Sequence, residues 1–309
     1  MRRIVGIIMF VPGVLLLVGG FMKLLPVANV WIGMGFFATL IGALVFGLSF
    51  VRPHQPAPGA PAPLSPADRI TGVFYDPARV FANLRHHPRW LAGFLIIALC
   101  IVIYSVAFTQ RMTPEVIAAA PIDKMIESGW IQGDKAAQVR ERTVEIAKTT
   151  AARITGPLNG VGFMFLLLLF EAALFLLFVL MFGGKMNYWQ SLSVACYALL
   201  PPLVIQYLLS IILLYVKSVD ELDPIKDQQG LVRADLGLLL TPAEHPYLYV
   251  IASFIGLLAL YRLWLTATGF RETGERLSNG SAWAIALTLG VLYLLFMLIM
   301  AAIFPNFVA

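Results

Sequence analysis

The run FLLLLFEAALFLLFVL, residues 165–180, decides the fold. Fifteen of its sixteen residues are apolar, which suits a helix that lies in a lipid bilayer, and the exception is Glu171. The whole chain has the same character: its 309 residues are 60% hydrophobic and 13% charged, with a mean hydropathy of +0.84. Soluble domains are nearer half apolar and a quarter charged. The sequence therefore predicts an all-α, polytopic membrane protein.

A transmembrane helix needs about 20 predominantly apolar residues. Seven stretches meet this length and predict about seven transmembrane helices, at residues 4–22, 29–51, 90–109, 158–182, 189–216, 246–269 and 282–304. The first stretch follows Arg2 and Arg3 and lacks a small-x-small cleavage site. This favours a retained signal anchor over a cleaved signal peptide.

The proline- and alanine-rich segment VRPHQPAPGAPAPLSP (51–66) predicts an extended linker without a core. We therefore divide the chain into an N-terminal transmembrane hairpin (1–51), a cytoplasmic linker (52–66) and a membrane domain (67–309). Within the hairpin, Ala38 and Gly42 form a small-xxx-small face that can pack the second helix against the first.

Two segments outside the spans predict further helices. Residues 110–156 predict a small periplasmic cap of two helices, the second starting at Asp134 and interrupted near Gly156-Pro157. Residues 76–87 predict a helix capped by Asp76 that lies on the cytoplasmic leaflet, or alternatively the first turns of the next span. On this helix Phe81 and Leu84 would enter the lipid, while Arg79 and Arg85 would contact anionic headgroups.

The distribution of Lys and Arg predicts the orientation. With the N-terminus in the cytoplasm, the inner segments carry Arg2, Arg3, Arg52, Arg69, Arg79, Arg85, Arg89, Lys185, Arg271 and Arg276. Outer segment 217–245 is rich in acids. Segment 110–156 carries seven basic residues, but the rule weakens for a translocated segment of this size. The C-terminus is then periplasmic.

From about residue 66 the chain resembles a bacterial member of the Yip1-domain family. The similar stretches are GVFYDPARVFANLRHHPRWLAGFLIIAL (72–99), GGKMNYWQSLSVACYALLPPLV (183–204) with Tyr197, Pro201 and Pro202, and LYRLWLTATGFRETGERLSNGSAWAIAL (260–287). The resemblance implies a five-helix membrane core and an inner-membrane protein, in some cases found with ABC-type exporters. The Asp-Leu-Tyr-Gly-Pro signature of eukaryotic members is missing, so their association with Rab GTPases is not carried over.

Little in the sequence indicates catalysis. No two of the four histidines stand at an i, i+4 metal spacing, and Gly183-Gly184-Lys185 lacks the full pattern of a phosphate-binding loop. We therefore expect no catalytic residue, cofactor or bound metal. Nucleic acid is also excluded as a partner, because no basic cluster is interleaved with aromatic residues.

Two functions remain. The first is a non-enzymatic scaffold or accessory protein in envelope transport or membrane organisation, whose partners include lipids and membrane transporter subunits. The alternative is a transporter of small solutes or lipids that uses Glu171 and a helix break at Pro201-Pro202, since buried acids and broken helices occur together at transport sites.

The intramembrane acid has three interpretations. Counting residues along the fourth and sixth spans puts Glu171 and Arg262 at similar depths, which predicts an ion pair inside the bundle. Alternatively, Glu171 is neutral and hydrogen-bonded to Tyr197 or Gln206, or it faces a water-filled path. Arg262 could also extend to the cytoplasmic interface.

The orientation can be tested by cysteine labelling from outside the membrane. A single cysteine at Ser128 should react with an impermeant reagent, because it lies in a segment that we expect to be periplasmic. A cysteine at Ser278 should not react. Labelling at Ser278 alone would reverse the orientation.

Overall fold

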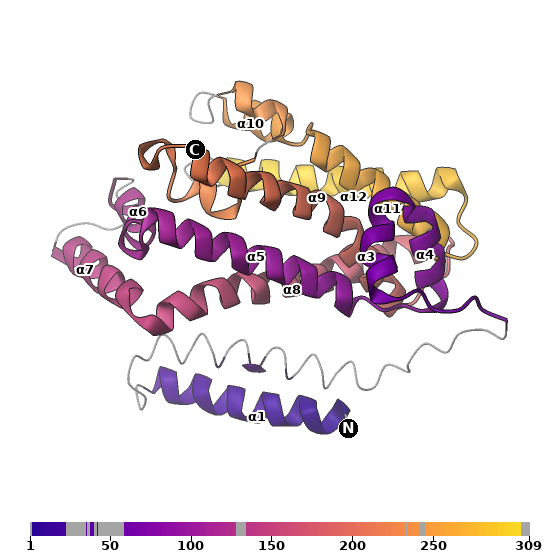
Figure 1. Ribbon diagram of the computed structural model, residues 1–309, viewed down its shortest axis with the longest axis horizontal. Helices are drawn as coiled ribbons and strands as arrows, with labels where there is room; N and C mark the ends of the chain where they lie inside the picture. The colour runs from indigo at the N-terminus through magenta and orange to yellow at the C-terminus, as the bar shows by residue number, and fades with distance from the viewer. Residues whose placement is uncertain are drawn as a thin grey trace. The chain divides into compact units, whose positions relative to one another are not determined.

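The computed structural model describes residues 2–22, 35, 38–39, 42, 59–127, 134–232, 234–240 and 245–303. The chain divides into two compact units, Met1–Gln55 and Pro56–Ala309. In the described ranges the regular structure is helical, with eleven α-helices and three short 3-10 helices (Figure 1). The all-α class expected from the sequence is therefore confirmed.

The first unit contains α1 (Arg2–Phe21). A Cβ atom added to Gly13 would lie 2.7 Å from the carbonyl carbon of Ala38, and one added to Gly35 would overlap the backbone of Leu17. Small residues thus allow α1 and this part of the chain to approach closely, which agrees with a contact made by Ala38. Most of the expected span 29–51 lies outside the described residues.

The second unit is built on four long apolar helices that lie alongside one another (Figure 1). They are α5 (Leu91–Met112), α8 (Thr150–Met181), α9 (Tyr188–Val216) and α12 (Asn279–Ile303). Each is long and apolar enough to cross a membrane, and they match four of the expected spans. The protein is therefore a multi-pass membrane protein, although the described residues do not confirm all seven spans.

The expected continuous span 246–269 is wrong. The structure has two helices here, α10 (Pro246–Ser253) and α11 (Leu257–Thr273), separated at 254–256. Gly256 is extended, and the backbone at the break pairs with a distant segment: Leu257 N–H donates to the carbonyl of Ala234 (2.9 Å), and Leu236 N–H donates to that of Ile255 (3.2 Å). These bonds replace those that a continuous helix would make.

The expected helix break at Pro201-Pro202 is also wrong. Both prolines are buried within α9, which stays helical over 29 residues. They remove two N–H donors, yet the helix is held by contacts with α5, α8 and α11 on its sides. Tertiary packing overrides the local preference here.

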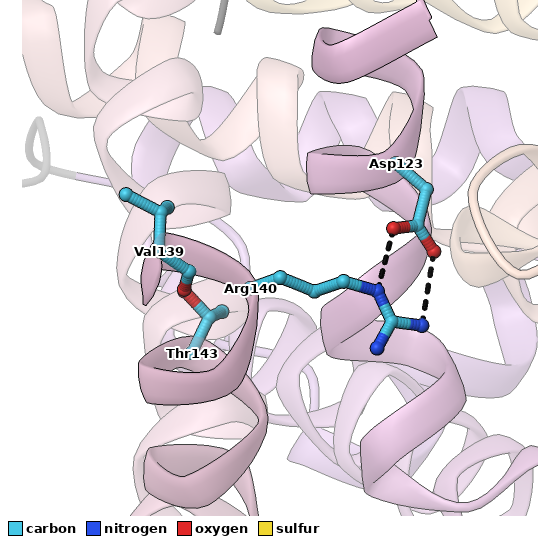
Figure 2. A network of polar contacts seen from close by, with 4 residues as sticks. All are labelled: Asp123, Val139, Arg140 and Thr143. Carbon is cyan, nitrogen blue, oxygen red and sulfur yellow. Dashed lines mark hydrogen bonds and ion pairs between the residues drawn. The ribbon is translucent and has the colours of Figure 1, made fainter. Parts of the chain in front are cut away.

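Two helices, α6 (Pro114–Glu127) and α7 (Asp134–Lys148), pack together at one end of the long helices, as expected for a cap. Figure 2 shows Arg140 of α7 reaching Asp123 of α6 with two hydrogen bonds of 2.7 and 3.3 Å. The interruption expected near Gly156-Pro157 lies instead at Thr149, whose hydroxyl oxygen accepts the N–H of Ala152 (3.2 Å) and so caps α8. Pro157 lies inside α8.

At the opposite end lie α3 (Pro66–Tyr75) and α4 (Pro77–His86) (Figure 1). The predicted cap of α4 is confirmed, because the Asp76 carboxylate accepts the N–H of Arg79 (3.3 Å). The sequence did not predict α3, although Ser65 caps it and a proline begins it.

The last part of the expected linker is held against α4. The side chain of Asn83 accepts the N–H of Leu64 (3.1 Å) and donates to the carbonyl of Ala62 (2.9 Å). The His87 ring lies 2.8 Å from the carbonyl of Pro61 and must act as the donor there. The chain at 61–64 is therefore held against the end of α4 instead of being free.

Candidate functional site

The end of the bundle formed by α3 and α4, which we call the α4 end, gathers three segments far apart in the sequence. They are residues 72–99, residues 183–204 and residues 260–287, the same stretches that carry the family resemblance. In the structure these ranges form α4 with the start of α5, the turn and first half of α9, and α11 with the start of α12. The similar motifs thus build one region.

Glycines allow these elements to pack closely. A Cβ atom added to Gly269 of α11 would lie 2.6 Å from a methyl carbon of Val194 on α9 and 3.3 Å from the ring of Phe81 on α4. A Cβ atom added to Gly93 of α5 would lie 3.3 Å from the ring of Tyr197. Larger side chains at these two positions would force the helices apart.

Polar contacts join the same elements. The Thr273 hydroxyl donates to the carbonyl of Phe81 (3.2 Å), and the Gln190 side chain donates to the carbonyl of Arg85 (2.7 Å). Lys185 and Glu275 exchange two backbone hydrogen bonds of 2.9 Å each, which ties the turn before α9 to the turn after α11. The Arg85 guanidinium lies 3.4 Å from the Glu275 carboxylate.

Arg69 of α3 is the charged residue most deeply buried in this region, with 2% of its surface exposed. Its guanidinium donates to the carbonyls of Ser65 and Arg89, both at 3.4 Å, and the Tyr197 hydroxyl donates to the same Arg89 carbonyl. Burial lowers the pKa of Arg69, since the charged form loses hydration. The sequence analysis counted Arg69 only among the basic residues of the cytoplasmic segments. The available signal for its burial was its spacing of four residues from Val73, which puts both side chains on one face of a helix.

The expectation that α4 inserts into lipid is wrong for its apolar face. Phe81 and Leu84 are fully buried, and α4 packs on α11, α9 and α3. Arg79 remains exposed, whereas Arg85 pairs with Glu275. The helix is amphipathic as predicted, but its apolar side faces protein, because the neighbouring helices provide a surface that a single sequence segment does not reveal.

The intramembrane ion pair is present. A guanidinium nitrogen of Arg262 lies 2.6 Å from the Glu171 carboxylate and donates a hydrogen bond to it, as the depth argument predicts. Glu171 lies ten residues before the end of α8, and Arg262 eleven before the end of α11. At 1.5 Å per residue both lie roughly 15 Å from the α4 end, near the middle of a 30 Å hydrocarbon layer.

The pair is not sealed inside the bundle, contrary to our expectation. The Glu171 side chain is 24% exposed and that of Arg262 is 40% exposed, so both reach the lateral surface between α8 and α11. The alternative partners of Glu171 lie elsewhere. The Tyr197 hydroxyl donates to the Arg89 carbonyl, and the side chain of Gln206 lies beside Gly230.

In the part of the chain that the structure describes, no three His, Cys, Asp or Glu side chains are grouped so that they could hold a metal ion. Cys196 is buried and Cys100 is partly exposed, and neither forms a disulfide.

Comparison with known families gives a match to the Yip1 domain over residues 71–301. The match spans most of the chain and includes the α4 end and all four long helices. The protein therefore belongs to the Yip1-domain family of membrane proteins. Searches of curated proteins and of solved structures find no significant match.

Replacing either charge of the intramembrane pair tests its contribution to stability. Glu171→Gln should destabilise the protein by about 2–3 kcal/mol, because it leaves the Arg262 charge unpaired near the bilayer centre. The double variant with Arg262→Gln should recover most of this loss. The measurement is reversible unfolding in mixed micelles.

The pair Arg271–Glu272 at the end of α11, at 2.7 Å and with side chains 42% and 28% exposed, is the matched control. Glu272→Gln should change the unfolding free energy by less than about 0.5 kcal/mol, since solvent screens that charge. If the losses from Glu171→Gln and Arg262→Gln simply add, the two side chains are not energetically coupled.

Proposed function

We propose that this Yip1-domain membrane protein is a non-enzymatic scaffold or accessory protein, and that its α6–α7 cap binds a subunit of a membrane transporter such as an ABC-type exporter. Proteins of the family are tied to membrane trafficking, which is compatible with a binding role. The observation that carries the proposal is a charged cleft at the cap.

The cleft has a volume of about 660 Å³ and lies between α6, α7 and the loop at 220–225. Its charged lining residues are Asp123, Lys124, Glu127, Arg140, Asp220, Glu221 and Asp223. Acids outnumber bases five to two in this set, so the cleft favours a partner with basic groups. It is open, so side chains of a partner protein can enter it.

Both walls of the cleft are ordered by polar contacts. The bidentate Arg140–Asp123 pair fixes α7 against α6 (Figure 2). On the other wall, partial burial by itself would raise the pKa of Asp223, but the N–H groups of Ile225 and Lys226 donate to its carboxylate and lower the pKa below its ordinary value. A preformed cleft loses less conformational entropy when a partner binds.

Transport of a small solute or lipid is the second candidate. Two observations favour it: the Glu171–Arg262 pair is partly exposed near mid-membrane, and α10 and α11 form a discontinuous helix. Against it, the acid already has a cationic partner, and the break at Pro201-Pro202 on which the hypothesis rested is not there.

Flux measurements separate the two candidates. If the protein is a scaffold, purified protein in liposomes should produce no pH-dependent uptake or lipid exchange beyond that of empty liposomes, because its acid is held by Arg262. Flux that is abolished by Glu171→Gln, but kept in Glu272→Gln, would support transport instead.

Co-purification in mild detergent tests the binding role. Arg140→Ala removes the ion pair that orders the cleft, so exporter subunits should be recovered with it in smaller amounts than with the unmodified protein. Arg142→Ala removes the same charge from an exposed position of α7 and should leave recovery unchanged. Equal recovery with both variants would argue against the cap as the binding surface.

A further inference from the structure

The segment between α9 and α10, which the sequence predicts as an outer loop, folds back along the long helices. Its second half makes three separate contacts with them. The Tyr104 hydroxyl of α5 donates to the carbonyl of Asp227 (2.5 Å), and the N–H of Val232 donates to the hydroxyl of Ser210 on α9 (3.1 Å). The third contact is the backbone pairing of 234–236 with the break between α10 and α11.

The depth of these contacts can be counted from a common level. Gly93 packs on Tyr197, and Gly269 packs on Val194, so Leu91, Ala195 and Gly269 lie within about one helical turn of the same height. From Leu91 to Arg111 the helix α5 rises about 30 Å, the thickness of the hydrocarbon layer.

All three contacts lie at the same height above that level. Tyr104 is 13 residues beyond Leu91, Ser210 is 15 beyond Ala195, and Ile255 is 14 before Gly269. At 1.5 Å per residue these separations are all about 20–22 Å. The segment therefore descends to roughly 10 Å below the level of Arg111. An independent contact agrees, because the ring of Phe254 at the break lies 5.6 Å from that of Tyr293, halfway along α12.

At this depth the chain exposes leucines. The 3-10 helix η3 (Leu236–Leu239) has Leu238 65% exposed and Leu239 81% exposed. Behind them Gly237 is buried so tightly that a Cβ atom there would overlap the hydroxyl of Ser253. The leucines therefore point away from the protein, and η3 itself packs on α10.

We propose that residues 234–240 form a re-entrant segment in the half of the bilayer distal to the α4 end, and that Leu238 and Leu239 contact lipid acyl chains. Irregular backbone survives at membrane depth only where its polar groups are paired. Here the pairing is with the break at 254–256, and the Asp235 carboxylate accepts the N–H of Gly237 (2.9 Å).

The charge of Asp235 has a favourable position in this arrangement. The residue lies against Gly256, the first residue before α11, so its carboxylate is close to the positive end of that helix. Acyl chains are favoured over a protein partner because the exposed leucines continue the apolar lateral surface of α10, where Tyr247 is 52% and Leu248 55% exposed.

The test uses the full-length protein, with Cys100 and Cys196 replaced by alanine, reconstituted alone into phosphatidylcholine vesicles. A nitroxide is attached in turn to Leu239→Cys and Leu238→Cys, and its collisions with oxygen and with a water-soluble nickel chelate are measured. Leu99→Cys, exposed on α5 near mid-membrane, is the lipid standard. Glu221→Cys, exposed in the loop, is the water standard.

The re-entrant segment predicts that labels at 238 and 239 match the oxygen-to-nickel collision ratio of the label at 99 and greatly exceed that at 221. A ratio equal to that at 221 would place the leucines in water and overturn the proposal. Low collision rates with both reagents would mean that protein, such as a second copy, covers them, which overturns it equally. Each variant is first checked for an unchanged thermal midpoint.

Discussion

The need to pair every backbone polar group inside the chain governs this structure, because the bilayer offers no water to do so. Four long helices meet the need by themselves. The region of α10 and α11 does not: the helix is interrupted at 254–256, and the backbone around Ala234 provides the missing partners. The break and the descending segment therefore depend on each other, because either one alone would leave backbone N–H and C=O groups unpaired at that depth.

The α4 end shows how the same helices are fixed against one another. Close approach at Gly269 and Gly93 brings α4, α5, α9 and α11 together. Hydrogen bonds from the side chains of Thr273 and Gln190 join α11 and α9 to α4. The buried Arg69 adds backbone contacts from α3. The family match includes most of this region.

The features that the sequence predicted correctly are those that depend on hydropathy and on local helix caps. Length and apolarity identified the four long helices, and Asp76 followed by proline identified the start of α4. Counting residues also paired Glu171 with Arg262, because the depth of a residue along a membrane helix follows from its number at a fixed rise per residue. The features that the sequence did not predict depend on contacts between distant segments. Pro201-Pro202 indicates a helix break locally, yet packing keeps α9 continuous. Gly256 gives little local signal, yet the helix breaks there.

The ion pair also has a consequence for how the chain is made. Glu171 and Arg262 are 91 residues apart, so at roughly 5–20 residues per second the acid is synthesised about 5–18 s before its partner. During that interval α8 has to enter the membrane with a carboxylate that no arginine yet neutralises. The strong apolarity of the other residues of α8 offsets the roughly 2.5–3.5 kcal/mol that such a group costs at the helix centre. When α11 enters the membrane, Arg262 can pair with the acid. Because α11 follows α8 along the chain, the ion pair forms late in assembly.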